Sequence, residues 1–561
     1  MTSTDSMKID FSLIHDIDID KMKSQFVLNE DDIKYDYTPF DNKDLQKYNP
    51  IYDIFFNMND TNYDKIGFNH KYQIVDLENV YDHENKTTIP KNTFIKFSPL
   101  LDPVKFLIGK YNLNDDSLLS LPNLQNKDKE TKLNDANNSS YVDCFFSFLS
   151  SKMLNEHKVS TCIDFYGSFL TVQRKYKINI ADDFEYLSDS KFFMENMNKM
   201  YDFSKYDLIQ SFIDKNSRKN KDRLCISDED VVLDIEELDC DTLVDNTNGN
   251  ELEEIYNNTA NPEMDDSSSS EDNDSSESDD ESESESGDED DVSSDSLGSI
   301  SSEICENMNV YINNFPTQMI CLEKCDDTFD SLLENESLDD ASSSAALLQV
   351  IMSLIIFQKA FHFTHNDLHT NNIVYKETDK THLFFKYNSQ FYKIPTYGKI
   401  FKIIDFGRSI YKYKGHLFCS DSFAPGGDAS TQYNFKPYYN SDKPNIEPNY
   451  SFDLCRLGCS IYDFIIDDDE AENMNELQKT IKRWCDDDNN VNVLYKKNGS
   501  ERYPNFKLYK MIARTVHNHT PHAQLEFDFF KQYACSQEDV DLEDVDLEDV
   551  VNIDEIPCYA K

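Results

Sequence analysis

The chain places several chemically capable side chains directly behind its most apolar segment. The stretch FHFTHNDLHTNNIVY, residues 361–375, contains Asp367, His369 and Asn372, and Asp405 follows a second apolar run in FKIIDFGRS. A carboxylate can orient an alcohol and accept its proton. Carboxylate and amide oxygens are also the hard ligands that Mg²⁺ prefers. The alternative without chemistry is a polar loop that caps a buried helix.

The spacing of these residues favours the chemical interpretation. Asp367 and Asn372 stand in an H-x-D-x-x-x-x-N pattern, Asp405 opens a D-F-G, and SFDLCRLGCSIYDF at 451–464 contains D-x-x-x-x-G. Together the three segments resemble the catalytic loop, the metal-binding segment and the following helix of protein kinases. The resemblance implies that Asp367 orients the acceptor hydroxyl, that Asn372 and Asp405 bind Mg²⁺, and that Asp453 holds the catalytic loop through its backbone.

Weaker matches lie upstream. Lys96 in FIKF resembles the strand lysine that contacts the phosphates of ATP; an exposed strand lysine is the alternative. The usual glutamate partner is not evident, and Asp143 on a predicted helix is the nearest suitable carboxylate. LEKC at 322–325 resembles the hinge between the kinase lobes, which implies that backbone groups of Glu323 and Cys325 face the adenine edge.

The chain also departs from the kinase pattern. No G-x-G-x-x-G precedes Lys96, where Gly67 stands alone, and this puts ATP affinity in question. Asn366 replaces the usual arginine, so we expect activity that does not depend on activation-loop phosphorylation. His369 replaces the usual lysine, and D-L-H-x-x-N resembles haspin-like kinases and small-molecule phosphotransferases of the aminoglycoside and choline type. His369 is a phosphate contact or a hydrogen-bonding residue within the loop.

The elements that must position these residues follow from their apolar patterns. Ser139 or Ser140 is the predicted cap of a helix with an apolar stripe. Strands early in the chain and helices late predict an α+β fold. The predicted strands are 88–100, 162–176 and 316–325, and the longest apolar helix is 345–357.

Composition limits the partners. The chain has 561 residues and a formal net charge of -53, from 107 acidic and 54 basic side chains. This charge argues against nucleic-acid binding and favours a basic protein substrate. The N-terminus lacks a signal peptide pattern, and the run 345–357 is shorter than the roughly 20 residues that span a bilayer, so no membrane role is expected. The scattered cysteines predict reduced thiols.

Changes in composition divide the chain. Residues 227–302 are acidic, rich in serine and poor in apolar side chains, which predicts a disordered insert that is a spacer or a phosphorylated segment. The predicted layout is an N-terminal extension (1–60), the first part of a small, mainly β lobe (61–226), the insert (227–302), the hinge strand (303–325), a large, mainly α lobe (326–533) and an acidic tail (534–561).

We therefore expect a bilobal protein-kinase-like fold that uses ATP and Mg²⁺ to phosphorylate serine or threonine of protein substrates. The AT-rich composition and the FIKFSPL and SFDLCRLG segments resemble kinases of large cytoplasmic DNA viruses of amoebae, which implies the host cytoplasm or the virion as location. A pseudokinase scaffold and a small-molecule phosphotransferase stay open as alternatives. The sequence does not indicate an oligomeric state.

Overall fold

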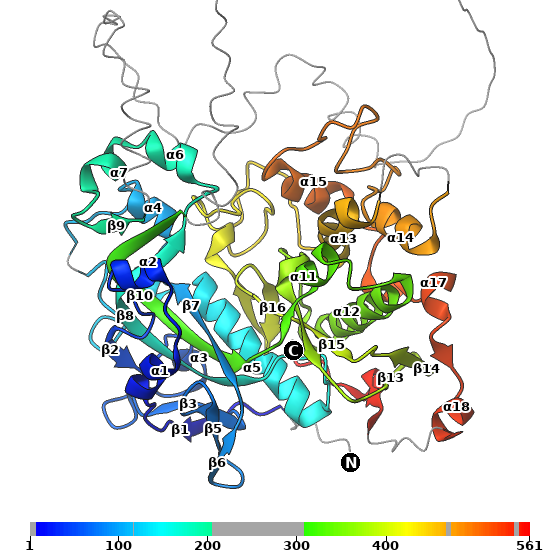
Figure 1. The fold of residues 1–561 in the computed structure, drawn as a ribbon, viewed down its shortest axis with the longest axis horizontal. Coiled ribbons are helices and arrows are strands. Elements are labelled where there is room, and N and C mark those ends of the chain that lie inside the picture. Colours follow the sequence, from blue (N-terminus) through cyan, green and yellow to red (C-terminus); the bar gives the residue numbers. More distant parts are fainter. Residues whose placement is uncertain (1–6, 116, 205–307, 467–472, 543–548) are drawn as a thin grey trace, which may run out of the picture. The chain divides into compact units, whose positions relative to one another are not determined.

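A five-stranded antiparallel sheet forms the centre of the N-terminal half of the chain (Figure 1). The structure is a computed structural model that describes residues 7–204 apart from 116, and residues 308–466, 473–542 and 549–561. The two long central strands are rich in Val, Ile, Phe and Tyr, which favour a pleated, buried surface. Four strands pair in the order β2-β8-β10-β7, and β9 pairs with β10. Their bounds are β2 Asn42–Gln46, β7 Thr93–Pro99, β8 Phe165–Asn179, β9 Tyr201–Phe203 and β10 Asn309–Glu323.

Helix α5, Ser139–His157, packs against β8 and β10. Asn138 caps the helix, because its side chain accepts a hydrogen bond from the N–H of Ser140. The prediction that Ser139 or Ser140 is the cap is therefore wrong, although the predicted helix is present. Its C-terminus lies at Lys158, which has a left-handed φ of 57°.

The aromatic side chains of α5 connect the sheet to the C-terminal half. The ring centroid of Phe146 lies 4.2 Å from that of Phe363 and 4.6 Å from that of Phe406. All three side chains are fully buried. Because Phe363 and Phe406 flank the two predicted catalytic motifs, this packing fixes both motifs against the helix that carries Asp143.

Among the described residues, two smaller sheets and a set of short helices complete the N-terminal half. β1 pairs with β3, and β4, β5 and β6 form a three-stranded antiparallel sheet. The strands are β1 Phe11–Leu13, β3 Ile66–Phe68, β4 Tyr72–Ile74, β5 Asn79–Asp82 and β6 Thr87–Pro90, and the helices are α1 Ile19–Gln25, α2 Glu30–Lys34, α3 Tyr52–Phe55, α4 Pro103–Leu107, α6 Phe184–Ser188 and α7 Lys191–Asn196. Strand β2 belongs to the predicted N-terminal extension but pairs with β8, so the central sheet recruits residues upstream of the predicted boundary at 61.

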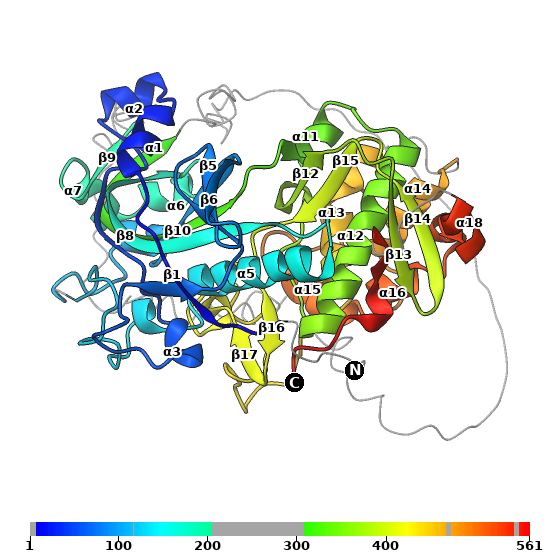
Figure 2. The same cartoon turned by 90° about the horizontal axis from the view of Figure 1, so that it is seen from below.

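Helix α12, Asp340–Phe361, runs through the C-terminal half (Figure 2). It begins at Asp339, whose side chain accepts from the N–H of Ser342, and it ends at His362, which has a left-handed φ of 51°. Its length and composition would allow a membrane span, but 94% of its most apolar window is buried inside the protein. Such burial is typical of the core helix of a globular domain.

Short sheets and further helices surround α12. β12 pairs with β11 and β15, and β16 pairs with β17. In the antiparallel β12–β15 register, Ile373 lies opposite Ile403. Asn372, just before β12, and Asp405, just after β15, therefore lie at the same end of this pair of strands. The strands are β11 Asp327–Thr328, β12 Ile373–Glu377, β15 Lys399–Ile403, β16 Ile410–Tyr413 and β17 His416–Cys419, and the helices are α11 Phe329–Glu334, α13 Phe452–Ile465, α14 Glu476–Trp484, α15 Lys507–Thr515, α16 Pro521–Gln524 and α17 Asp528–Lys531.

The described parts of the predicted acidic tail pack onto the rest of the chain. Strands β13 His382–Tyr387 and β14 Gln390–Pro395 form a hairpin that β18 Ala534–Cys535 and β19 Val551–Asn552 extend at its two edges. Helix α18, Gln537–Leu542, follows β18. Tyr559 is buried, and its backbone N–H donates to the carbonyl of Ala360 at the end of α12. The last residues therefore help to fix the helix that leads into the predicted catalytic loop.

The mixed helix and sheet architecture agrees with the predicted α+β class. The predicted strands at 162–176 and 316–325 correspond to β8 and β10, and the run 88–100 forms two strands, β6 and β7. The predicted insert, 227–302, lies outside the described residues.

Candidate active site

The predicted catalytic loop is held through its backbone. The N–H groups of His365 and Asn366 donate to the two carboxylate oxygens of Asp453 at 2.9 and 2.8 Å. Asp453 is completely buried on α13, so these two hydrogen bonds compensate for the cost of burying its charge. The backbone of Thr364 also forms an isolated antiparallel β-bridge with that of Ile410, at the start of β16. The structure thus gives Asp453 the contact that the kinase resemblance implied.

Asp367, His369 and Asn372 lie together in this loop. The Asn372 side-chain nitrogen donates to the backbone carbonyl of Asp367 at 2.9 Å and lies 3.1 Å from Nε2 of His369. His369 is thus engaged by a loop side chain, which favours the loop hydrogen-bonding interpretation over a phosphate contact. Because its amide nitrogen is used inside the loop, Asn372 has its amide oxygen left to bind a ligand.

Asp405 is brought next to this loop by the β12–β15 pair. The N–H of Ile404 donates to the carbonyl of Asn372 at 3.0 Å. Asp405 itself has a left-handed φ of 63°, which is uncommon for a residue other than glycine and is typical of functional sites. The donors offered here, a carboxylate and an amide oxygen, fit a Mg²⁺ ion that keeps waters and phosphate oxygens as further ligands.

Lys96 joins the central sheet to these motifs. Its Nζ lies 2.7 Å from Oδ2 of Asp143 and 2.8 Å from Oδ1 of Asp405. The other oxygen of Asp143 accepts from the N–H of Phe406 at 3.0 Å. The structure therefore brings Lys96 and its predicted partner together, and Asp143 also fixes the backbone of the D-F-G segment.

One ammonium group serves two carboxylates in this cluster. Burial opposes the charge of Lys96, but Asp143 and Asp405 outweigh it and raise the Lys96 pKa. Burial would raise the pKa of Asp405, yet the adjacent Lys96 lowers it to about 2. Burial raises the pKa of Asp143, and Lys96 offsets only part of that rise. Negative charge is thus concentrated on Asp405, the residue predicted to bind the metal.

The predicted hinge is connected to β15 by a buried ion pair. Lys402, three residues before Asp405, contacts the carboxylate of Glu323 and donates to the carbonyl of Cys162 at 2.9 Å. The backbone N–H of Glu323 donates to the carbonyl of Asp164, so it is not free for an adenine ring. The prediction that backbone groups of Glu323 face the adenine edge stays a prediction.

Cys325 has a different environment. Its side chain is half-buried, and within the described part of the chain its backbone N–H has no hydrogen-bond acceptor. A free N–H at the end of β10 is the group that an adenine acceptor nitrogen needs. The prediction for Cys325 therefore stands, with its role still to be tested.

The carboxylate of Asp367 has two side-chain partners that sequence reasoning missed. The hydroxyl of Tyr509 on α15 donates to Oδ1 at 2.7 Å, and Arg408 lies 3.4 Å from Oδ2. Arg408 also contacts Asp428 at 2.6 Å. Arg408 directly follows D-F-G and could have been noticed there, whereas Tyr509 stands 142 positions after Asp367 in no recognisable motif.

Gly67, the glycine upstream of Lys96, does not form a phosphate-binding loop. Gly67 lies in β3, buried, and a side chain added to it would meet Ile14 and Tyr52. It therefore serves close packing and no phosphate loop. Three or more His, Cys, Asp or Glu side chains are nowhere grouped as a metal site within the described ranges.

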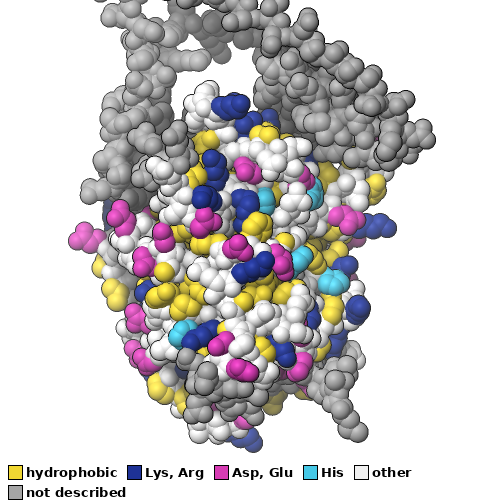
Figure 3. All heavy atoms as spheres, turned by 90° about the vertical axis from the view of Figure 1, so that its right-hand side faces the viewer, with side chains coloured by type: hydrophobic (Ala, Val, Ile, Leu, Met, Phe, Trp, Pro, Cys, Tyr) yellow, Lys and Arg dark blue, Asp and Glu magenta, His cyan; other side chains and the backbone are white. Residues whose placement is uncertain are grey.

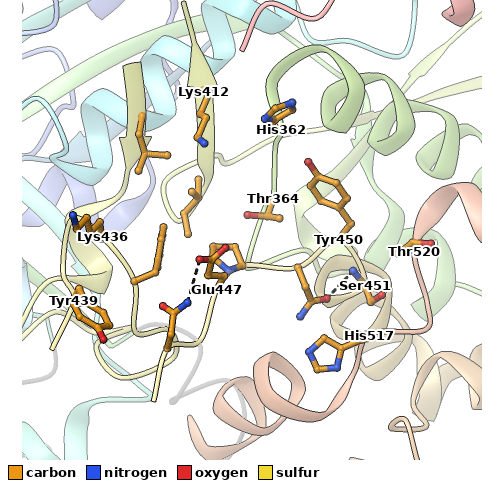
Figure 4. Close-up of a pocket in the computed structure, with 16 residues that line it drawn as sticks. His362, Thr364, Lys412, Lys436, Tyr439, Glu447, Tyr450, Ser451, His517 and Thr520 are labelled. Atoms are coloured by element: carbon orange, nitrogen blue, oxygen red, sulfur yellow. Dashed lines mark hydrogen bonds between the residues drawn. The ribbon is translucent and has the colours of Figure 1, made fainter. Parts of the chain in front are cut away.

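A large cavity, about 880 Å³, is lined by residues at the start of the catalytic loop and before α13 (Figure 4). Thr364 and Ser451 line it, together with Lys412 and Lys436. None of the predicted nucleotide-binding residues belongs to its wall. Cavity size therefore does not identify the predicted site, which is defined by its polar contacts.

Comparison with known proteins finds similarity over part of the chain. No family model matches the chain. A segment of 111 residues is 32% identical to the serine/threonine-protein kinase haspin of Mus musculus, and the haspin of Bos taurus matches to the same extent. The similarity is to a protein kinase. The match covers 19% of this chain and spans 14% of each haspin, so it supports a protein-kinase-like relationship over a limited region.

Proposed function

We propose that this protein is an ATP-dependent protein kinase that transfers the γ-phosphoryl group to serine or threonine hydroxyls. The observation that carries the proposal is the assembly of Lys96, Asp367, Asn372 and Asp405 from β7, the loop after α12 and the end of β15. These three segments are separated in sequence, and together they supply the four groups that phosphoryl transfer to an alcohol requires. The haspin similarity adds independent support.

In this mechanism each side chain has one task. Lys96 binds the α- and β-phosphates of ATP, and Asp405 and Asn372 hold Mg²⁺. When bound, Mg²⁺ neutralises the phosphate oxygens. Asp367 orients the acceptor hydroxyl and takes its proton as the acceptor oxygen bonds to the γ-phosphorus and the bond to the leaving oxygen of ADP breaks.

The fold proposed for this activity is bilobal. The sheet of β2, β7, β8, β9 and β10 with helix α5 would be the small lobe, and the region around α12 and α13 the large lobe. The hinge would follow β10, where the free N–H of Cys325 would donate to adenine. The Lys402 and Glu323 ion pair would hold this hinge against β15.

Regulation by activation-loop phosphorylation is not part of the proposal. Asn366 is fully buried, and its side chain donates to the carbonyl of Arg408 and accepts from the hydroxyl of Tyr433. These contacts support a loop that is held by neutral hydrogen bonds. Arg408 is already paired with Asp428. The Asp428 carboxylate therefore supplies the negative charge that a phosphate on the activation loop would otherwise supply.

The test is a transfer assay with purified protein, Mg²⁺ and γ-labelled ATP. A basic protein such as histone or myelin basic protein serves as acceptor, because the net charge favours a basic substrate. Label on serine or threonine that is lost in both Asp367→Ala and Asp405→Ala supports the proposal. Failure of the folded wild type to bind Mg²⁺·ATP in calorimetry would contradict it.

A pseudokinase scaffold is the second candidate. The position of Gly67 inside β3 favours it, because the phosphates would lack a flexible glycine-rich cover. Binding of Mg²⁺·ATP without label on any protein would leave this candidate or a small-molecule phosphotransferase. A screen of sugar, choline and aminoglycoside alcohols separates those two.

A further inference from the structure

Tyr509 occupies a defined place beside the predicted catalytic carboxylate. It lies on α15, and its hydroxyl donates a hydrogen bond to Oδ1 of Asp367 at 2.7 Å. A distance of 2.7 Å is an ordinary length for a well-formed O–H···O hydrogen bond and also falls within the range for a charged acceptor. Nothing in the sequence around Tyr509 indicates this contact.

The hydroxyl of Tyr509 is itself held from the other side. Nε of Arg456 on α13 donates to the Tyr509 oxygen at 2.9 Å. Arg456 lies less than one helical turn after Asp453 on α13. Asp453 is the residue that binds the backbone of the catalytic loop. Helix α13 thus reaches the loop twice, directly through Asp453 and indirectly through Arg456 and Tyr509.

The ring of Tyr509 is fixed as well. The guanidinium carbons of Arg408 and Arg456 lie 5.7 and 5.1 Å from its centroid, within the range of cation–π contacts. The ring of Phe506 stacks on it, with centroids 5.4 Å apart. Phe452 also lies against it, with centroids 6.1 Å apart, and a tyrosine held by two arginines and two aromatic rings has little freedom to rotate.

His369, a polar side chain of the loop two positions after Asp367, is engaged by Asn372. Tyr509 and Arg408 are the side chains that contact the Asp367 carboxylate within the described part of the chain. Each carboxylate oxygen can accept two hydrogen bonds, so these contacts leave capacity for an acceptor hydroxyl.

Building on the proposed kinase activity, we propose that Tyr509 is a positioning residue that fixes the orientation of Asp367 toward the acceptor hydroxyl. Tyr509 acts through Asp367 and does not touch the nucleotide. It is anchored by Arg456, and Arg408 holds the opposite oxygen of the same carboxylate. An unfixed Asp367 would spend less time in the orientation that permits attack, which lowers the turnover number.

The experiment compares Tyr509→Phe with wild type in the transfer assay. We expect kcat to fall about 10- to 100-fold, with the KM for ATP and the Kd of Mg²⁺·ATP within twofold of wild type. Tyr495→Phe is the matched control, because the Tyr495 hydroxyl also binds a carboxylate, that of Asp463, at 2.8 and 2.9 Å. This control should keep kcat within twofold.

A second pair of measurements separates positioning from general support of the fold. In an Asp367→Asn background, Tyr509→Phe should cause no further loss, because its effect passes through the missing carboxylate. Arg456→Met, which keeps a long apolar stem but loses the donor to Tyr509, should lower kcat several-fold and leave the KM for ATP unchanged. If Tyr509→Phe lowers folded yield, Arg456→Met carries the test.

The outcomes are distinct. An active wild type whose Tyr509→Phe variant has equal or higher kcat overturns the positioning role alone; higher kcat would mean that Tyr509 competes with the acceptor. A further loss in the Asp367→Asn background also overturns it. A folded wild type that transfers phosphate to no protein overturns the proposed function, and the positioning role with it.

Discussion

The proposed nucleotide side and the proposed acceptor side of the candidate site are built in different ways. On the nucleotide side, Lys96, Asp143 and Asp405 form one cluster in which an ammonium serves two carboxylates. On the acceptor side, the single carboxylate of Asp367 is contacted by Tyr509 and Arg408. The first side is rich in negative charge and suits a metal ion with phosphates, whereas the second combines a carboxylate with a neutral and a cationic donor and suits an alcohol.

The comparison shows why net charge is a poor guide to a local site. Residues 227–302 alone contain 29 acidic and no basic side chains, so much of the charge of -53 belongs to one segment. The face of the described chain in Figure 3 carries acidic and basic side chains interspersed. Beside Asp367, two arginines lie within contact of Tyr509. A basic substrate thus stays a prediction from composition, and the acceptor side itself is not uniformly acidic.

The largest expected effects come from exchanging one carboxylate on each side. Asp367→Asn should lower transfer by about 10³-fold and leave Mg²⁺·ATP affinity within twofold, because only proton acceptance is lost. Asp405→Asn should abolish transfer and also weaken Mg²⁺·ATP binding at least tenfold, because it removes a hard ligand. Calorimetry measures the Mg²⁺·ATP affinity of each variant, and the transfer assay measures its rate. Equal losses of nucleotide affinity in the two variants would break the distinction between the sides.

Lys96 should matter for stability as well as for catalysis. Lys96→Met removes the single cation between Asp143 and Asp405, so we expect a loss of roughly 3 kcal/mol in the free energy of unfolding and about 10²-fold in transfer rate. Asp143→Asn leaves Lys96 paired with Asp405 and should cost only about 1 kcal/mol. Denaturant unfolding measures the loss of unfolding free energy in each of the two variants. A larger cost for Asp143→Asn than for Lys96→Met would contradict the shared-cation description.

The ion pair between Lys402 and Glu323 at the proposed hinge should affect stability more than catalysis. Lys402→Met leaves the carboxylate of Glu323 without its partner and should destabilise the fold by about 3 kcal/mol, whereas the double variant with Glu323→Gln should recover at least half of that. We expect kcat at saturating ATP to change less than threefold for either. The midpoint of thermal unfolding and a steady-state assay are sufficient. Recovery that fails in the double variant would mean that the two residues act independently.

The smallest effect is expected at Asp428 on the acceptor side. Asp428→Asn removes an ion pair to Arg408 in which both side chains are partly exposed, and such pairs contribute less than about 1 kcal/mol. Transfer should fall less than about fivefold, and more at low than at high ionic strength, because salt screens exposed charges. A loss as large as that of Tyr509→Phe would show that Asp428 is as important for Asp367 as the tyrosine.

Part of the site could be predicted because its residues act through short-range patterns. Asp367, Asn372 and Asp405 follow apolar elements at fixed spacings, and the antiparallel pairing of β12 with β15 then places them together. Asp143 was a weaker prediction that helical periodicity allowed, since it lies on the same helix as Phe146. The cap of that helix was missed because Asn138 and Ser139 are both good capping residues.

Other features depended on long-range contacts. The backbone N–H of Glu323 pairs with the carbonyl of Asp164, a segment far away in the sequence, and no local pattern indicates that contact. The buried ion pair between Lys402 and Glu323 was not predicted, because no spacing rule connects two residues 79 positions apart. The role of Cys325 and the layout of residues 227–302 stay predictions.

The sequence by itself determined the local chemistry of this protein: which loops carry carboxylates and amides, which strands and helices precede them, and where composition changes. The tertiary structure decided which of these groups share a site. It paired Lys96 with two carboxylates and brought Tyr509 to Asp367 across 142 positions. The physical reason is that spacing within one element is set by backbone geometry, whereas contacts between distant elements are set by how their side chains pack and pair once buried.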